Sequence, residues 1–515
     1  MGWLCTSQPG TRAPQRICLI ANSRFCALQE ENARQEMSQT AVKPACKHAT
    51  LGQSLLQKVA QMSCVLDRPQ FDRVAKFVLD PALEVPQEVL ERIALLLVDT
   101  LGVAAGAATL EVGQIARDFA VEFHAASSDK HSATLLFDGR TCAIPGAAWA
   151  LATQIDNLDG HDGYNPTKGH IGCALVPALF AYAGQHPQLT GRQALTALAM
   201  GYEVAARAGV ALHATVSDYH TSGAWNALGV AALGAHLRRQ TSDVLREALG
   251  IAEYHGPRSQ MMREIANPTM LHDGSGMGAL VGISSLFLAE RGFTGAPAIT
   301  VEREDVAHIW EDLGQDWTIL RNYIKPYPIC RWAHGALEGV RVLMVEQGLR
   351  AAEIERLEVA TFAQSAALFP NLPKTTSEAQ YSLGFALATL LVHGRIGPEH
   401  ITGSGLNDPE VARLHARITV REEPRHSARF PGGRWSDVTA ILQDGRRLTS
   451  GDVNARGGPE APMPEADVRA KLGAMAGHVL SEGRIAALWD MKHRLLQPDM
   501  LFSEMADLVT PAPDR

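Results

Sequence analysis

The segment at residues 154–173 gathers acidic, basic and imidazole side chains between two apolar stretches. These side chains belong to Asp156, Asp159, His161, Asp162, Lys168 and His170. The flanks, residues 144–152 and 174–183, are rich in alanine and predict buried helices. Because unpaired charge is costly in buried surroundings, we interpret the segment as a site loop. Asp156 and Asp159 are candidate metal ligands, helix caps or general bases, and Gly169 lets the backbone approach a ligand closely.

Two further segments place a histidine at a predicted helix start. His220 is followed by two hydroxyl residues that are candidate N-caps, and the free N–H groups of a helix start favour an anion. His272 and Asp273 precede three alternating glycines and an apolar helix. This pattern lacks the G-x-x-x-x-G-K-[ST] spacing of a phosphate loop, and close helix packing explains the glycines equally well. Each histidine is therefore either an acid–base group or a structural residue, and Asp273 is either its orienting partner or a cap.

The segment at residues 324–334 concentrates positive charge beside two prolines. Lys325, Arg331 and His334 fall within ten residues of one another and lie next to Cys330 in the sequence. The prolines hold the chain extended, and arginine is a good bidentate donor to a carboxylate. The segment is therefore a candidate carboxylate clamp, with a solvated basic surface as the alternative.

The elements that must position these residues follow from hydrophobic periodicity. Helical spacing recurs at residues 86–106, 111–126, 144–156, 173–185, 191–212, 221–238, 241–254 and 276–291, with a short hairpin near 133–142. Strand patterns follow at 357–362, 418–421 and 438–442, interleaved with helices near 335–348, 376–392 and 408–415. A Gly/Pro-rich linker at 456–464 precedes helices at 465–476 and 480–494. The predicted fold class is mainly α, a large all-α helical domain plus a smaller α+β lid domain.

The domain boundaries follow from the same patterns. Residues 51–299 form the helical domain, 300–455 the lid domain, and 456–515 the C-terminal helices that return to the helical domain. Residues 1–50 are predicted to be a disordered N-terminal extension, and Met37 is an alternative start.

Composition excludes several classes of protein. A net charge of −8 argues against a nucleic-acid surface. The eight cysteines show no C-x-x-C spacing, which favours reduced thiols in a cytoplasmic protein over disulfides or a zinc site. No apolar run reaches about 18 residues, so no membrane span is predicted.

Taken in order, the four segments resemble the MmgE/PrpD family, which includes 2-methylcitrate dehydratase, cis-aconitate decarboxylase and iminodisuccinate epimerase. The resemblance covers residues 55–495 and includes the helix at 97–106. It implies a helical domain, an α+β lid with the site between them, and a homodimer. His220 matches the family's active-site histidine. The sequence departs from the family pattern at Leu158, which replaces a carboxylate, at Ile171, which replaces a proline, and at His272, where members often carry lysine.

The leading hypothesis is a metal-independent lyase, a dehydratase or decarboxylase, acting on a small di- or tricarboxylate without a cofactor. His170 or His220 would act as acid–base, oriented by Asp156 or Asp159. The candidate catalytic residues are Asp156, Asp159, His161, His170, His220 and His272, and the candidate substrate-binding residues are Lys168, Lys325, Cys330, Arg331 and His334. The alternatives are an epimerase using the same pocket, a metal hydrolase built on Asp156, Asp159, His161 and His170, and a non-catalytic binding protein.

Overall fold

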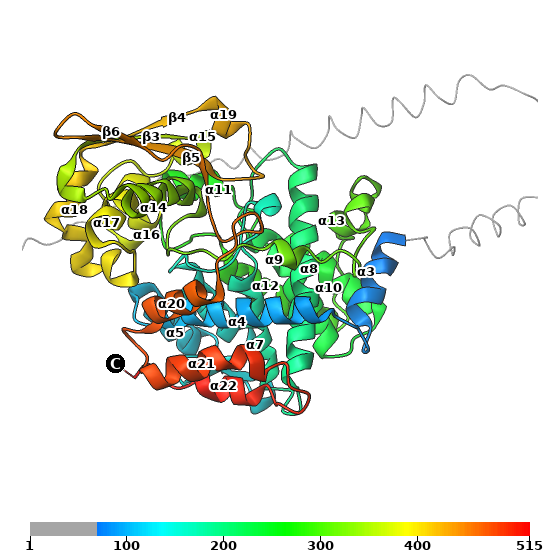
Figure 1. Cartoon of the computed structure of the whole chain (residues 1–515). Helices are drawn as coiled ribbons and strands as arrows, with labels where there is room; N and C mark the ends of the chain where they lie inside the picture. The colour runs from blue at the N-terminus through cyan, green and yellow to red at the C-terminus, as the bar shows by residue number, and fades with distance from the viewer. Residues whose placement is uncertain (1–68, 515) are drawn as a thin grey trace, which may run out of the picture. The chain divides into compact units, whose positions relative to one another are not determined.

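Apolar helices make the core of the part of the chain that the structure describes, residues 69–514 of a computed structural model (Figure 1). The predicted N-terminal extension lies outside the described residues. The first helices are α3 (Pro69–Leu79), α4 (Gln87–Ala107), α5 (Glu111–Phe123), α6 (Ile144–Asp156), α7 (Gly172–Ala183), α8 (Gly191–Thr215), α9 (Gly223–Leu237), α10 (Ser242–His255), α11 (Met261–Ala266), α12 (Ser275–Ala289) and α13 (Ile299–Glu302). A hairpin, β1 (Ser132–Thr134) with β2 (Thr141–Ala143), precedes α6. The predicted hairpin and the eight helices predicted up to residue 291 are confirmed, most of them within two residues at each end.

Helices α6, α7, α8, α9 and α12 pack directly on one another. They are apolar on nearly every face, as expected for helices enclosed by others. Small residues allow their close approach: a side chain at Gly229 of α9 would lie 2.7 Å from Ala205 Cβ of α8. Helix α8 is long and apolar enough to cross a membrane, but 89% of its apolar window is buried inside the protein, as in a core helix. Helices α4 and α5 meet the same criteria only as a pair, which is bent by 93°.

The second part, which we call the sheet region (residues 334–454), contains a mixed sheet. Its strands are β3 (Ile354–Thr361), β4 (Ile418–Glu422), β5 (Trp435–Leu442), β6 (Arg447–Thr449) and β7 (Val453–Asn454). The strand order is β4-β3-β5-β6, with β3 parallel to β4 and antiparallel to β5, and β7 pairs with β5. The helices of the region are α14 (His334–Gln347), α15 (Ala363–Ala366), α16 (Thr376–Gln380), α17 (Leu383–His393), α18 (Pro409–His415) and α19 (Pro424–Ser427).

Side chains alternate between buried and partly exposed along β5, so one face of the sheet is covered. Helix α14 packs on β5 and β3, and α17 contacts β4 (Figure 1). The prediction of one continuous helix over residues 376–392 is wrong. The segment forms two helices, because Tyr381 ends α16 and the Ser382 side chain accepts a hydrogen bond from the backbone N–H of Phe385 to start α17. This break places Tyr381 at the candidate site.

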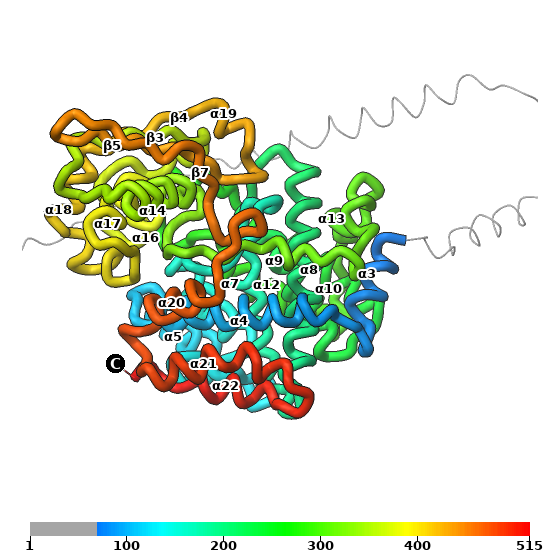
Figure 2. The backbone as a smooth tube through the Cα atoms, viewed as in Figure 1, coloured from blue at the N-terminus to red at the C-terminus, as the bar shows by residue number. Residues whose placement is uncertain are grey.

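The chain then runs back from the sheet region to the helices, as Figure 2 shows between β7 and α20. Helices α20 (Glu465–Ala476) and α21 (Glu482–Arg494) pack on α4, and α22 (Ser503–Val509) packs on α21. We call α3–α13 together with α20–α22 the helical body. The described residues are 57% helix and 9% strand, so the predicted mainly α fold class with a smaller α+β part is confirmed.

Candidate functional site

A small enclosed cavity lies where the helical body meets the sheet region. All four segments singled out in the sequence contribute side chains to it. Its lining comprises Asp159, Lys168, His170, Tyr219, Met261, Ile265, Asp273, Tyr323, Cys330, Arg331, Trp332, Tyr381 and Arg434. The volume of this central cavity is about 20 Å³, enough for about one water molecule. The site is therefore closed in this structure.

His170 presents a free imidazole nitrogen to the central cavity. Its Nδ1 lies 2.8 Å from the carbonyl oxygen of Asp162. Because a carbonyl only accepts hydrogen bonds, Nδ1 carries the proton and Nε2 is left with its lone pair. Burial and the charge of Lys325 hold the pKa of His170 well below its ordinary value, so the ring is neutral at pH 7. A neutral imidazole with an unprotonated nitrogen can accept a proton from a ligand.

Asp273 is the carboxylate nearest to this nitrogen. Its Oδ2 lies 3.7 Å from His170 Nε2. Ser222 fixes the pair, since its hydroxyl donates to Asp273 Oδ1 at 2.8 Å and accepts from the backbone N–H of His170 at 3.0 Å. Burial, reinforced by Asp156, raises the pKa of Asp273 to about 6. The sequence predicted Asp273 to be either a partner of the preceding histidine or a helix cap, whereas the structure places its carboxylate beside His170.

Asp156 and His161 form a second layer behind His170 and do not line the central cavity. Asp156 Oδ2 accepts from the backbone N–H of Ser275 at 3.1 Å, and Oδ1 lies 3.5 Å from His161 Nε2. Burial raises the pKa of Asp156 to about 7 and lowers that of His161 to about 4. The His161 ring meets the His170 ring edge-on, with centroids 4.6 Å apart. Both residues therefore reach a ligand only through residues that line the cavity, His170 and Asp273 among them.

Lys325 does not form the carboxylate clamp that the sequence suggested. Its side chain is fully buried and does not line the central cavity. Its ammonium group donates to the carbonyl oxygen of Asp159 at 2.9 Å and to the carboxylate Oδ1 of the same residue. In this structure the ion pair holds the Lys325 side chain against the site loop, outside the cavity lining. Asp159 Oδ2 is buried without a hydrogen-bond partner.

Three other cations line the central cavity: Lys168, Arg331 and Arg434. Within residues 69–514 none of them forms an ion pair with a carboxylate. The Arg331 guanidinium donates to the carbonyl oxygens of Arg456 at 2.7 Å and Ala455 at 3.1 Å. Burial lowers its pKa to about 10, which leaves it charged at pH 7. This wall of the cavity suits an anionic ligand.

Cys330 also lines the central cavity, but as a neutral group. Burial raises the pKa of its thiol to about 12, so it is not a thiolate at pH 7. Arg434 enters from the sheet region and was not singled out in the sequence. No local pattern separates it from the other arginines between residues 413 and 434.

Besides His161, three other predicted histidines are not brought into the lining of the central cavity. His220 donates its backbone N–H to His213 Nε2 at 3.2 Å, and only its neighbours Tyr219 and Ser222 reach the site. His334 begins α14 and is bonded through Nε2 to the carbonyl oxygen of Ile329 at 2.9 Å. His272 lies behind the lining, with its ring centroid 5.5 Å from that of Tyr381. Burial lowers the pKa of His272 to about 3, so it is neutral.

The four residues of the metal-hydrolase hypothesis do not converge, because Asp159 pairs with Lys325 and His170 bonds a carbonyl oxygen. A different set of potential metal ligands does converge: ligand atoms of Asp156, His161 and Cys173 all lie within 4.8 Å of one another. Cys173 Sγ lies 3.1 Å from Ser275 Oγ, and burial raises the pKa of this thiol far above its usual value. A metal there would have to displace that thiol proton.

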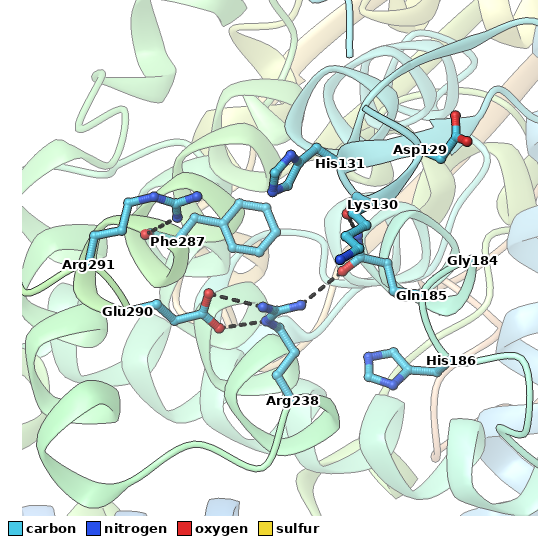
Figure 3. A pocket seen from close by; sticks show the side chains of 10 residues that line it. All are labelled: Asp129, Lys130, His131, Gly184, Gln185, His186, Arg238, Phe287, Glu290 and Arg291. Atoms are coloured by element: carbon cyan, nitrogen blue, oxygen red, sulfur yellow. Dashed lines mark hydrogen bonds and ion pairs between the residues drawn. The ribbon is translucent and has the colours of Figure 1, made fainter. Parts of the chain in front are cut away.

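A larger hollow of about 550 Å³ opens elsewhere on the helical body (Figure 3). Arg238 crosses it and bonds Glu290 with two hydrogen bonds of 2.6 and 3.0 Å. A third bond of 2.8 Å joins Arg238 to Gln185. Arg238 and Glu290 thus pair with each other, whereas the other charged residues of the lining, Asp129, Lys130 and Arg291, form no ion pair within residues 69–514.

Family models match most of the chain. The MmgE/PrpD N-terminal domain model matches residues 72–311, and the MmgE/PrpD C-terminal domain model matches residues 327–496. No curated protein matches the sequence. The two models together place the site segments in both domains. The chain belongs to the MmgE/PrpD family.

Proposed function

We propose that the chain is a metal-independent lyase, a dehydratase or decarboxylase, acting on a small di- or tricarboxylate such as 2-methylcitrate or cis-aconitate. Members of its family are generally enzymes, dehydratases and related activities among them. One observation carries the proposal. A neutral imidazole nitrogen of His170 faces a cavity whose cations Lys168, Arg331 and Arg434 have no carboxylate partner among the described residues.

Proton transfer next to a carboxylate needs both features. His170 Nε2 takes the proton from the carbon beside the carboxylate, and the electron pair left behind develops negative charge on the carboxylate oxygens. Fixed cations in a cavity closed to water stabilise that charge as it forms. Asp273, 3.7 Å from Nε2, stabilises the imidazolium. In a dehydration the same imidazolium returns the proton to the leaving hydroxyl, so that the substrate loses one water.

Substrate entry requires the central cavity to open, since it holds about one water and not a tricarboxylate. A surface hollow of about 620 Å³ shares Lys168, Tyr219 and Trp332 with it. The ammonium group of Lys168 lies 4.7 Å from the centroid of the Tyr219 ring, whose own centroid is 6.1 Å from that of Trp332. We propose that these three side chains separate the entrance from the reaction cavity.

The test combines a substrate screen with one substitution. NMR would follow 2-methylcitrate, cis-aconitate and iminodisuccinate in H₂O and D₂O. His170→Asn keeps a donor for the Asp162 carbonyl and removes Nε2, so turnover of the wild-type substrate should fall by about 10²- to 10⁴-fold. His236→Asn is the matched control, because His236 is a partly buried histidine whose Nδ1 also bonds a carbonyl oxygen, that of Val78, at 2.7 Å, outside the site.

Three results would contradict the proposal. Turnover in His170→Asn within about threefold of wild type would remove His170 from the reaction, since a general base contributes at least about 100-fold. Deuterium exchange at a stereocentre without elimination would indicate the epimerase instead. Loss of activity after dialysis against a chelator, restored by a divalent metal, would contradict the metal-independent mechanism.

A further inference from the structure

Arg434 is a buried cation whose charge no residue of the described chain balances. It directly precedes β5 and is 1% exposed. Its guanidinium donates to the carbonyl oxygen of Pro431 and lies over the Phe430 ring, 4.8 Å from the centroid. Its Nε is buried without a hydrogen-bond partner, and within residues 69–514 Arg434 makes no ion pair. Burial lowers its pKa.

The groups around Arg434 in the central cavity do not supply a counter-ion. The side chains whose negative forms would favour its charge are Tyr323, Tyr219 and Cys330. Burial raises the pKa of all three, so they are neutral at pH 7. A guanidinium that is removed from water and left unpaired destabilises the folded protein. A residue retained at such a cost is expected to serve a ligand.

Arg331, which also lines the central cavity, repeats the same arrangement. It is 4% exposed, and its Nε is also buried without a partner. Its two terminal nitrogens bond backbone carbonyl oxygens, and its guanidinium lies 4.1 Å from the centroid of Tyr323. After burial, the charge of Arg434 is one cause of the lowered pKa of Arg331, so the two guanidinium groups repel each other. An anion bound between them would relieve both the desolvation and the repulsion.

We infer that Arg434 is a carboxylate-binding residue that acts together with Arg331, so that the site selects substrates carrying at least two carboxylates over those carrying one. One carboxylate binds Arg331 and a second binds Arg434. The inference rests on the proposed function. It adds to that function a residue of the sheet region, Arg434, that distinguishes substrates with two or more carboxylates from those with one. Arg434 belongs to the sheet region, whereas the site loop belongs to the helical body. A bound polycarboxylate would therefore connect the sheet region to the helical body.

The experiment measures binding and stability in the same variants of the full chain. Calorimetry would give the affinities of propane-1,2,3-tricarboxylate, succinate and propionate for the wild type and for Arg434→Gln and Arg434→Lys. Thermal unfolding without ligand would be recorded in parallel. Arg429→Gln is the control, because Arg429 lies five positions before Arg434 in the chain and also stacks on an aromatic ring, that of Trp435 at 4.3 Å, but pairs with Asp452 outside the cavity.

The expected result is a loss of affinity without a loss of stability. Arg434→Gln should weaken tricarboxylate and succinate binding by about 10- to 100-fold, as expected for a charged hydrogen bond, and should leave propionate binding unchanged. Its melting temperature should equal or exceed that of the wild type, since an unpaired buried charge is removed. Arg434→Lys should fold and bind with intermediate affinity. Arg429→Gln should bind as wild type.

Two outcomes overturn the inference and are distinguishable from a failure of the proposed function. Tricarboxylate affinity in Arg434→Gln equal to that of the wild type would contradict it directly. A lowered melting temperature with unchanged affinity in Arg434→Lys would make Arg434 a structural residue. If the wild type bound none of the three carboxylates, the proposed function would fail, and this inference with it.

Discussion

Replacing Asp156 by asparagine should stabilise the protein above neutral pH, and the gain should disappear in acid. Asp156 is 2% exposed, and burial raises its pKa from 3.8 to about 7. Asparagine resembles the protonated acid in shape. Its amide oxygen can accept from the Ser275 N–H, as Oδ2 does at 3.1 Å, and its amide NH₂ can donate toward His161 Nε2. The substitution therefore removes a charge and keeps the contacts.

The magnitude follows from the difference between the two pKa values. Between pH 3.8 and about 7 the folded wild type retains a proton that the unfolded chain has released. The free energy of unfolding therefore falls as the pH rises through this window, by about 1.4 kcal/mol per pH unit for this group. The window spans about three units, so ionisation of Asp156 costs the wild type roughly 4 kcal/mol above pH 7. Asp156→Asn does not titrate and avoids this cost.

The assay is thermal or urea unfolding of the wild type and Asp156→Asn at several pH values from 4 to 9. Buried histidines such as His161, whose pKa is lowered to about 4, act in the opposite sense and lose stability as the pH falls below about 6.5. The difference between variant and wild type removes their contribution. It should be near zero at pH 4 and largest above pH 7. A difference that stays constant from pH 4 to 9 would refute the reasoning, and Asp490→Asn, at an exposed position, provides the control.

Two further substitutions test how the site loop is held. Gly172→Ala should lower the melting temperature by several degrees, because the added methyl would overlap two buried polar side chains; Gly184→Ala, at the other end of α7 with no atom nearby, should be neutral in the same thermal scan. Lys471→Met should destabilise the fold by about 3–5 kcal/mol in urea unfolding, because it leaves the buried Asp99 without its 2.7 Å partner. Lys492→Met should cost clearly less, since the carboxylate partner of that buried lysine is largely exposed.

The elements of this fold were predictable because their signals are local. Helix α6 was predicted at its observed bounds, residues 144–156, and α20 at its observed bounds, residues 465–476. The signals for both, apolar spacing and a proline or glycine near the helix end, lie inside or directly beside each segment. The strands β3, β4 and β5 were also predicted from local patterns, but β3 and β5 begin three residues earlier than predicted. The break between α16 and α17 was missed because neither proline nor glycine interrupts residues 376–383. Only the Ser382 cap and the site contact of Tyr381 explain it.

The site was predictable as a set of segments but not as a set of contacts. Asp159 and Lys325 were each singled out, yet their pairing joins residues 166 positions apart and places a predicted substrate cation outside the cavity lining. His220 was favoured by its helix start, and the packing turned its neighbours, not its own ring, toward the cavity. Which side chain pairs with which is decided by tertiary packing, and no spacing within a segment encodes it.

Backbone strain gives an independent reason to regard the central cavity as the functional site. Five non-glycine residues among those described have a positive φ, and three of them, Asp159, Lys168 and His272, belong to the segments around this cavity. Such conformations cost of order 1–3 kcal/mol each and persist where the surroundings enforce them. At Asp159 two buried lysines hold the backbone, because Lys325 and Lys471 donate to the consecutive carbonyl oxygens of Asp159 and Gly160 at 2.9 and 2.7 Å. The strained backbone, the arginines without carboxylate partners and the Asp273 carboxyl, whose pKa is raised to about 6, are thus all found at or next to the central cavity. A fold selected only for stability would have none of these features.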